Sequence, residues 1–213
     1  MPRTSVNHPI FARFYAWMSP RMDEGGAADF RRQLVAGLSG HVIEVGAGNG
    51  LNFAHYPREV SSVLAVEPEA HLREIGVRNA ARARVRIVVV DGVAERLPAD
   101  DASADAVVYS LMLCSVADQG AVLREAYRVL RSGGEVRFLE HVRAQPGTLA
   151  RVQRALDATI WPIVGGGCHS ARDTAAAIAD AGFRIERLER FRFPDVRLSM
   201  PTSPHILGMA RRP

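Results

Sequence analysis

The chain of 213 residues carries a formal net charge of +4 and only two cysteines. Its length predicts one domain with a sizeable core, and Cys114 and Cys168 indicate neither a disulfide framework nor a zinc-binding spacing. All 27 basic residues are arginines scattered among 23 acidic residues. We expect no nucleic-acid partner, because a nucleic-acid surface concentrates basic side chains on one face. With no apolar run near the roughly 20 residues of a membrane span and no signal-peptide pattern, we expect a cytoplasmic protein without an integral membrane segment.

The first region, residues 1–38, is predicted to be a helical cap that belongs to the same domain as residues 39–213. Its segment 9–18 is amphipathic and rich in aromatic side chains, among them Phe11, Phe14 and Tyr15. Two interpretations stay open for this segment. It is either a lid that closes over a ligand or an aromatic stripe packed on the sheet as core.

A glycine-rich loop follows the first predicted strand, residues 41–46. The loop carries glycine at alternate positions, Gly46, Gly48 and Gly50, which lets the main chain turn tightly and approach a ligand closely. The dinucleotide pattern G-x-G-x-x-G fails here, because its third glycine position falls on Leu51. The loop therefore indicates a nucleotide-type cofactor and disfavours a nicotinamide oxidoreductase.

The second predicted strand, residues 62–67, ends in Glu67 and is followed by Pro68. In nucleotide-binding α/β folds, an acid at this point accepts hydrogen bonds from ribose hydroxyls. The alternative is that Glu67 caps the helix that follows it.

Strands and helices then alternate, which predicts an α/β fold with a doubly wound parallel sheet. Further strands are predicted at 85–91, 105–111 and 134–141, with helices near 50–56, 69–81, 118–131 and 173–181. Two last strands, 183–193 and 204–211, are expected to form an antiparallel hairpin at one edge of the sheet.

The pattern from Glu44 to Gly50 resembles the first motif of class I SAM-dependent methyltransferases, with Asn49 where threonine is commoner. Residues 94–98, 105–110 and 128–134 resemble other motifs of this family. The resemblance implies a Rossmann-like seven-stranded sheet, S-adenosyl-L-methionine (SAM) as cofactor and S-adenosyl-L-homocysteine as product. It also implies a cofactor site made of Glu44, Gly46, Ala47, Gly48, Asn49, Gly50, Glu67, Pro68, Gly92, Val93, Ala94, Ser110 and Tyr15. Val93 stands where the family often has an acid for the adenine amino group, and Asp91 lies two residues earlier.

Residues 113–116, 138–142, 167–172 and 204–208 are similar to segments of a UbiE-like methyltransferase group that includes the mammalian alkyl thiol S-methyltransferases. The N-terminal membrane anchor of the mammalian members is not expected here. The resemblance implies a small, fairly apolar acceptor, with a thiol as the first hypothesis. Alternatives are O- or N-methylation of a natural product, quinol or phospholipid headgroup, or a SAM-binding regulator or cyclase without methyl transfer. The oligomeric state stays open.

Three side chains are candidate catalytic residues: His141, Glu140 and His169. His141 ends the fifth strand and is partly uncharged near neutral pH, so it is a candidate base for a protonated acceptor. A purely structural, hydrogen-bonded His141 is the alternative. Glu140 is expected to orient a partner or to pair with Arg172. An apolar acceptor pocket is expected from Met112, Leu113 and Trp161.

Overall fold

A seven-stranded sheet forms the centre of the computed structural model, which describes residues 9–194 and 200–213. The strand order is β3-β2-β1-β4-β5-β7-β6, with β1–β5 parallel and β7 antiparallel to both β5 and β6. The bounds are β1 (Gly40–Val45), β2 (Val60–Val66), β3 (Ile87–Val90), β4 (Ala104–Ser110), β5 (Leu130–His141), β6 (Arg184–Arg192) and β7 (Pro204–Arg211). The predicted doubly wound sheet with an edge hairpin is confirmed.

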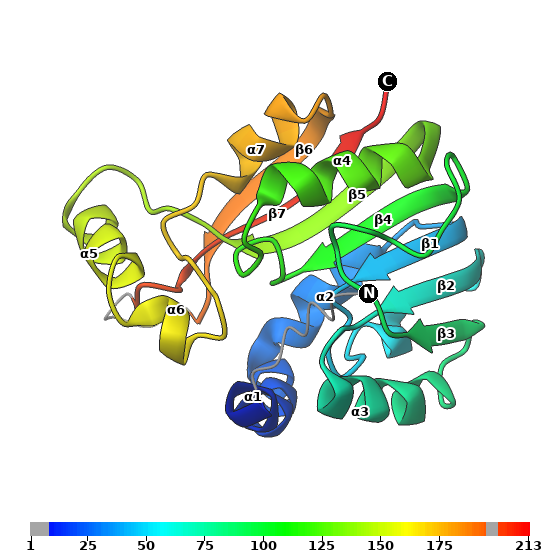
Figure 1. The fold of residues 1–213 in the computed structure, drawn as a ribbon, viewed down its shortest axis with the longest axis horizontal. Coiled ribbons are helices and arrows are strands. Elements are labelled where there is room, and N and C mark those ends of the chain that lie inside the picture. Colours follow the sequence, from blue (N-terminus) through cyan, green and yellow to red (C-terminus); the bar gives the residue numbers. More distant parts are fainter. Residues whose placement is uncertain (1–8, 195–199) are drawn as a thin grey trace.

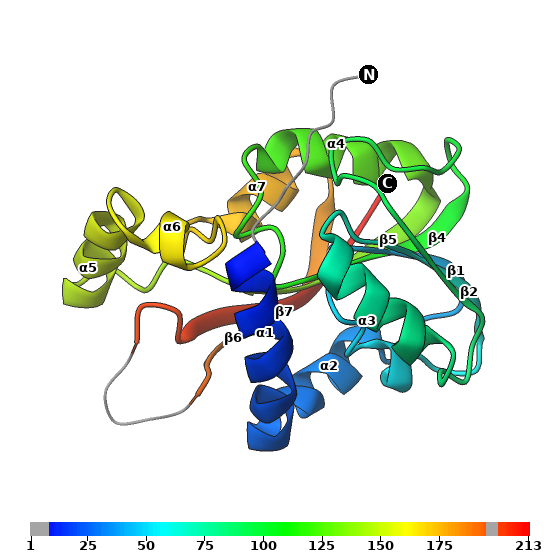
Figure 2. The same cartoon turned by 60° about the horizontal axis from the view of Figure 1, so that its bottom comes forward.

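Helices cover both faces of this sheet (Figure 1). On one face lie α4 (Gln119–Val129) and α7 (Thr174–Asp180), and on the other lie α2 (Ala28–Val35) and α3 (Ala70–Ala80). The N-terminal helix α1 (Pro9–Met22) joins α2 through a π-helical turn, η1 (Asp23–Ala27). Figure 2 shows α1 passing between α3 and the short helix α6 (Trp161–Val164), with α5 (Thr148–Asp157) beyond it. The first eight residues of the predicted cap lie outside the described residues.

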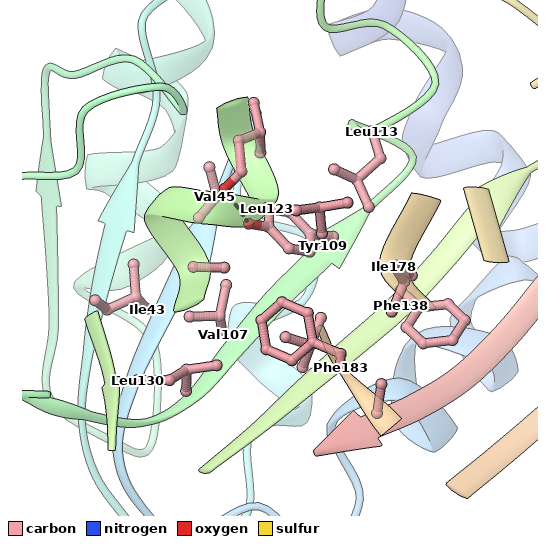
Figure 3. Packing of buried hydrophobic residues seen from close by; sticks show 14 of the residues in the cluster. Ile43, Val45, Val107, Tyr109, Leu113, Leu123, Leu130, Phe138, Ile178 and Phe183 are labelled. Carbon is pink, nitrogen blue, oxygen red and sulfur yellow. Dashed lines mark hydrogen bonds between the residues drawn. The ribbon is translucent and has the colours of Figure 1, made fainter. Parts of the chain in front are cut away.

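Two hydrophobic cores result from the alternation of side chains along the central strands. On β4, Val107 and Tyr109 join the cluster under α4 and α7, while Ala106 and Val108 join the cluster on the α2 side. Figure 3 shows the first cluster, in which Leu123 of α4 lies over the strands. Each large side chain that is fully buried here contributes about 1.5–3 kcal/mol, so the two layers fix the sheet firmly.

The helix predicted near 50–56 is wrong. The structure has only a 3-10 turn there, η2 (Phe53–His55). Gly50 has a φ of +78° and Pro57 follows closely, which leaves no room for a longer helix. The Phe53 ring also packs directly against Gly50, since a Cβ on Gly50 would lie 2.4 Å from this ring. The helices α5 and α6 were not predicted.

The strand order reverses between β1 and β4, so a crevice opens beyond the carboxyl ends of these strands. None of the helices in the described ranges 9–194 and 200–213 is long and apolar enough to cross a bilayer.

Candidate active site

A cavity of about 470 Å³ lies at this crevice, within the size range of small-molecule sites. The ends of β1, β2 and β4, the segment after β3, and α1 all contribute to it. Its wall is formed by Phe11, Ala12, Tyr15, Val45, Gly46, Gly48, Val66, Glu67, Pro68, Glu69, Leu72, Gly92, Val93, Ala94, Glu95, Ser110, Leu111, Met112, Ser115, Val116, Ala117 and Gly166.

The glycine loop serves two different purposes. At Gly46 the chain's own packing requires glycine, because a Cβ there would lie 2.3 Å from Cγ of Met112. Gly48, with a φ of +56°, lines the cavity, and a Cβ there would come no closer than 3.4 Å to other atoms, namely the Tyr15 ring. Gly48 therefore leaves its space to the cavity rather than to a neighbouring side chain.

The carboxylate of Glu67 is fixed at the cavity wall by two backbone amides. Oε2 accepts a bond from Gly48 N at 2.7 Å, and Oε1 accepts one from Glu69 N at 2.9 Å. Burial raises the pKa of Glu67, and the two amide bonds oppose this change. The cap of α3 is Glu69, whose side chain accepts from Leu72 N at 2.9 Å. Glu67 thus does not cap α3, and its oxygens keep acceptor capacity for a ligand.

The next part of the wall follows β3. Gly92, Val93 and Ala94, three of the predicted cofactor residues, line the cavity there. Asp91 does not line it. Its side chain is 72% exposed and pairs with Arg73 at 3.3 Å. A ligand would therefore meet an apolar wall at Val93, with the carboxylate of Asp91 directed elsewhere.

Glu44 is buried beneath the glycine loop and does not line the cavity. The structure therefore gives no support to its predicted direct contact with the cofactor. It accepts bonds from Asn52 Nδ2 at 2.8 Å and from the Tyr56 hydroxyl at 2.7 Å. Burial raises its pKa to about 7, against the effect of these two bonds. The acid of the first motif therefore holds the segment that follows the glycine loop.

Arg31 is a site residue that the sequence analysis missed. It is buried, pairs with Asp23 at 2.8 Å, and donates to Ser110 Oγ at 3.2 Å beside the cavity. Burial alone would lower its pKa, but Tyr15 and Asp23 beside it raise the pKa above its usual value. A buried cation thus lies behind two residues of the cavity wall, Tyr15 and Ser110. Only the presence of an arginine on an amphipathic helix could have indicated it.

Helix α1 closes one side of the cavity. Phe11 and Tyr15 both line it, and their rings stack with centroids 5.9 Å apart. Phe11 also reaches the segment after α6, since a Cβ on Gly166 would lie 2.5 Å from the Phe11 ring. Phe14 is 50% exposed, so it is not a core residue. The interpretation of α1 as a lid is favoured for Phe11 and Tyr15.

The structure brings together most of the predicted cofactor residues. Those that line the cavity are Tyr15, Gly46, Gly48, Glu67, Pro68, Gly92, Val93, Ala94 and Ser110. Three further predicted residues, Ala47, Asn49 and Gly50, belong to the loop but not to the wall. Asn49 is buried and donates to Ser19 Oγ of α1 at 3.0 Å, so it ties the loop to the lid.

Glu140 is fully buried and organises the segment after β4. Its oxygens accept bonds from the backbone amides of Met112, Leu113 and Cys114 at 3.0, 2.9 and 3.1 Å. Burial raises its pKa to about 7 in spite of these bonds. The expected pair with Arg172 is wrong, because Arg172 instead donates to Leu113 O at 2.9 Å. Glu140 therefore fixes the backbone that carries Met112 into the cavity wall.

His141 and His169 do not belong to the wall of this cavity. His141 Nδ1 lies 3.6 Å from Cys114 Sγ and 3.7 Å from Cys168 Sγ. The thiol of Cys114 and the imidazole of His141 lower the pKa of Cys168. His169 Nδ1 lies 2.8 Å from Gly167 O.

Of the three residues predicted for an apolar acceptor pocket, only Met112 lines the cavity. Leu113 is buried in the core under α4. Trp161 begins α6, and its Nε1 is buried without a hydrogen-bond partner among the residues that the structure describes.

Comparison with known proteins shows the family of this chain. Residues 43–138 match the family model described as Methyltransferase domain. The chain is 39% identical over 180 residues to thiol S-methyltransferase TMT1B of Mus musculus, covering 82% of this chain and 72% of that protein. It is 37% identical over 186 residues to thiol S-methyltransferase TMT1A of Homo sapiens, covering 84% and 74%. The chain belongs to the class I SAM-dependent methyltransferases, in the group of these two relatives. Its cofactor is SAM.

A solved structure shows the same fold for a methyltransferase with little sequence similarity. It is a SAM-dependent methyltransferase of Thermotoga maritima, a possible histamine N-methyltransferase, with a TM-score of 0.70 and 21% identity. The match covers 96% of this chain and 98% of that one. It supports the fold alone.

The cavity fits the cofactor of this methyltransferase family. Gly48 leaves open space at the wall, where a bulky ligand can approach the backbone. Glu67 offers a fixed carboxylate that can accept from hydroxyl groups. Arg31 keeps a positive charge beside Tyr15 and Ser110, where a carboxylate would be stabilised.

Proposed function

We propose that this methyltransferase transfers a methyl group from SAM to a small, apolar thiol, with S-adenosyl-L-homocysteine as the second product. The observation that carries the proposal is the uncharged part of the cavity wall. Its residues come from α1, from the segment after β4 and from the segment after α6: Phe11, Ala12, Leu111, Met112, Ser115, Val116, Ala117 and Gly166. Such a wall suits an acceptor that carries no charge of its own. The names of the two relatives support a thiol.

We assign the acidic and glycine-rich part of the wall to the cofactor. In this proposal Glu67 accepts from the ribose hydroxyls, and Gly92, Val93 and Ala94 contact the adenine. The Tyr15 hydroxyl, with the charge of Arg31 behind it, binds the carboxylate of the methionine moiety. The assignment is supported by the position of each residue on the wall or directly behind it.

The bound cofactor supplies an electrophilic methyl group on a sulfonium. The chain's own contribution is to place the acceptor and exclude water, which accounts for much of the rate in a displacement of this kind. Phe11 packs against Gly166 at the cavity wall, while Glu140 fixes the backbone of Met112 to Cys114. Precise positioning of the wall thus depends on a buried carboxylate that does not itself line the cavity.

A thiol with a pKa near 8.5 needs little help to lose its proton, whereas an aliphatic hydroxyl needs far more. His141 and His169 do not line the cavity. Their roles in proton transfer stay predictions. Glu140 is a positioning residue in this proposal. An enzyme that accelerates the reaction mainly by positioning the acceptor, rather than through a general base, needs an acceptor that ionises easily. This favours a thiol over an alcohol.

A panel of small acceptors tests the proposal. The purified protein is incubated with SAM and matched thiols, phenols and amines of similar size, and methylated products and S-adenosylhomocysteine are measured by mass spectrometry. We expect both products to form together with apolar thiols, and to form less with thiols that carry a carboxylate. Methylation of phenols or amines without methylation of any thiol would overturn the thiol acceptor. Absence of S-adenosylhomocysteine with every acceptor would count against methyl transfer itself.

A further inference from the structure

Two thiols and one imidazole meet directly behind the cavity wall. Cys114 follows β4, His141 ends β5, and Cys168 lies between α6 and α7, in the yellow to orange part of the chain in Figure 1. Their ligand atoms all lie within 4.8 Å of one another. In the described residues no further His, Cys, Asp or Glu joins this group. The spacing of the two cysteines along the chain did not indicate it, because the third member comes from a different strand.

The distances match those of a tetrahedral metal site. With Zn–S bonds of about 2.3 Å and Zn–N bonds of about 2.0–2.1 Å, a sulfur and a nitrogen ligand lie about 3.5 Å apart in a tetrahedron. The two S···N distances here are 3.6 and 3.7 Å. Thiolates and imidazole are also the donors that zinc and other soft metals prefer. Both sulfurs face the same ring nitrogen, as they would if all three atoms shared one ion.

Hydrogen bonds join the three segments that carry these side chains. Glu140, next to His141, accepts from the amide of Cys114 at 3.1 Å, which joins the first two ligands. The segment of Cys168, the third ligand, is joined to Cys114 by the bond from His169 N to Cys114 O at 2.8 Å. Gly167 makes this approach possible, since a Cβ there would lie 2.8 Å from Ser115 O. The ligands are therefore positioned by contacts that do not depend on the cluster itself, as a binding site requires.

We propose that Cys114, His141 and Cys168 form a zinc site with three protein ligands and a fourth position for water or a small molecule. Cys114 and Cys168 bind as thiolates and release their protons when the metal enters. The site joins the segment after α6, which carries Gly166, to the end of β4, which leads to Ser115. Gly166 and Ser115 both line the methyl-transfer cavity. The metal would thus fasten two parts of that wall to each other.

Cobalt titration tests the site without relying on activity. The full chain is reduced, freed of metal with a chelator, and titrated with Co²⁺ under nitrogen, and Zn²⁺ is then added. We expect one Co²⁺ per chain, with a sulfur-to-cobalt charge-transfer band and the visible bands of tetrahedral cobalt, all of which Zn²⁺ abolishes. In Cys114→Ser, Cys168→Ser and His141→Gln, Co²⁺ affinity should fall at least about 100-fold, because loss of an outer-shell partner alone costs up to about that much.

The matched control is His169→Gln, which changes a histidine beside Cys168 that is not part of the cluster. Its cobalt spectrum and affinity should equal those of the unchanged chain. The titration of the unchanged chain decides the matter even if a variant fails to fold. Absence of a cobalt–thiolate band in that chain would overturn the proposal. So would a native protein whose two cysteines are joined in a disulfide and whose reduced form takes up no metal.

Discussion

The amide of Gly48 donates a hydrogen bond of 2.7 Å to the carboxylate of Glu67, and this bond joins the loop after β1 to the end of β2. Both residues line the cavity, and the carboxylate is buried. The second oxygen of Glu67 is held by the amide of Glu69. Because both oxygens are already held, the Glu67 side chain loses little conformational entropy when a ligand binds. The free energy of its hydrogen bonds to the ligand is therefore not offset by the cost of ordering the side chain.

Replacement of Glu67 tests whether this carboxylate binds the cofactor. Glu67→Ala should weaken binding of S-adenosylhomocysteine by about 10- to 100-fold, because hydrogen bonds to a charged group contribute about 1.5–3 kcal/mol. Isothermal titration calorimetry measures the change. Glu74→Ala, at an exposed position of α3, is the matched control and should bind like the unchanged chain. Equal affinities in the two variants would show that another acid serves the cofactor.

The contact between Gly46 and Met112 predicts a coupled effect on stability. A Cβ on Gly46 would lie 2.3 Å from Met112 Cγ, and the φ of +67° disfavours any side chain. Gly46→Ala should therefore cost about 1 kcal/mol from the backbone and about 1–3 kcal/mol from overpacking. In a Met112→Ala background only the backbone cost should remain. Urea unfolding of the four proteins gives the coupling energy, and a value near zero would show that Met112 simply moves aside.

The sequence was sufficient to predict the sheet because its strands are short apolar runs that end in turn residues. The glycine loop and Glu67 could also be predicted, since their positions follow from the ends of β1 and β2. The short turn η2 could not, because tertiary contacts shape it. Phe53 packs beneath Gly50, and Asn52 bonds to Glu44.

Contacts at the site between residues that lie far apart in the sequence could not be predicted either. Arg31 belongs to a helix far from Ser110 in the sequence, and their contact depends on how α2 packs on the sheet. Glu140 was correctly selected as unusual, but its partners are backbone amides. Backbone partners leave no pattern of residue types that a sequence analysis could detect.

The lid interpretation of α1 predicts different effects for two neighbouring phenylalanines. Phe11 lines the cavity and contacts the segment at Gly166, whereas Phe14 is half exposed and lies beside the Trp17 ring. Phe11→Ala should weaken S-adenosylhomocysteine or acceptor binding by about 10-fold, the effect of losing 1–2 kcal/mol of apolar contact. Phe14→Ala should leave binding unchanged. Calorimetry together with melting temperatures checks this, and a loss confined to stability in Phe11→Ala would contradict a lid.

Glu44 predicts a dependence of stability on pH. Burial raises its pKa from 4.5 to about 7, so the folded chain holds this proton more tightly than the unfolded chain does. The resulting stabilisation is present in full below the unfolded pKa near 4.5 and is lost as the pH rises through about 7. The difference corresponds to about 3 kcal/mol.

Glu44→Gln removes this titration while keeping the shape of the side chain, and the Tyr56 hydroxyl can turn to accept from the new amide. The free energy of unfolding is measured in urea from pH 4.5 to 8 for both proteins. Relative to the variant, the unchanged chain should lose about 3 kcal/mol across this range. Glu140 titrates in both proteins, so its contribution cancels in the difference. A difference that stays constant with pH would show that Asn52 and Tyr56 keep Glu44 charged throughout, because their hydrogen bonds would then outweigh its burial.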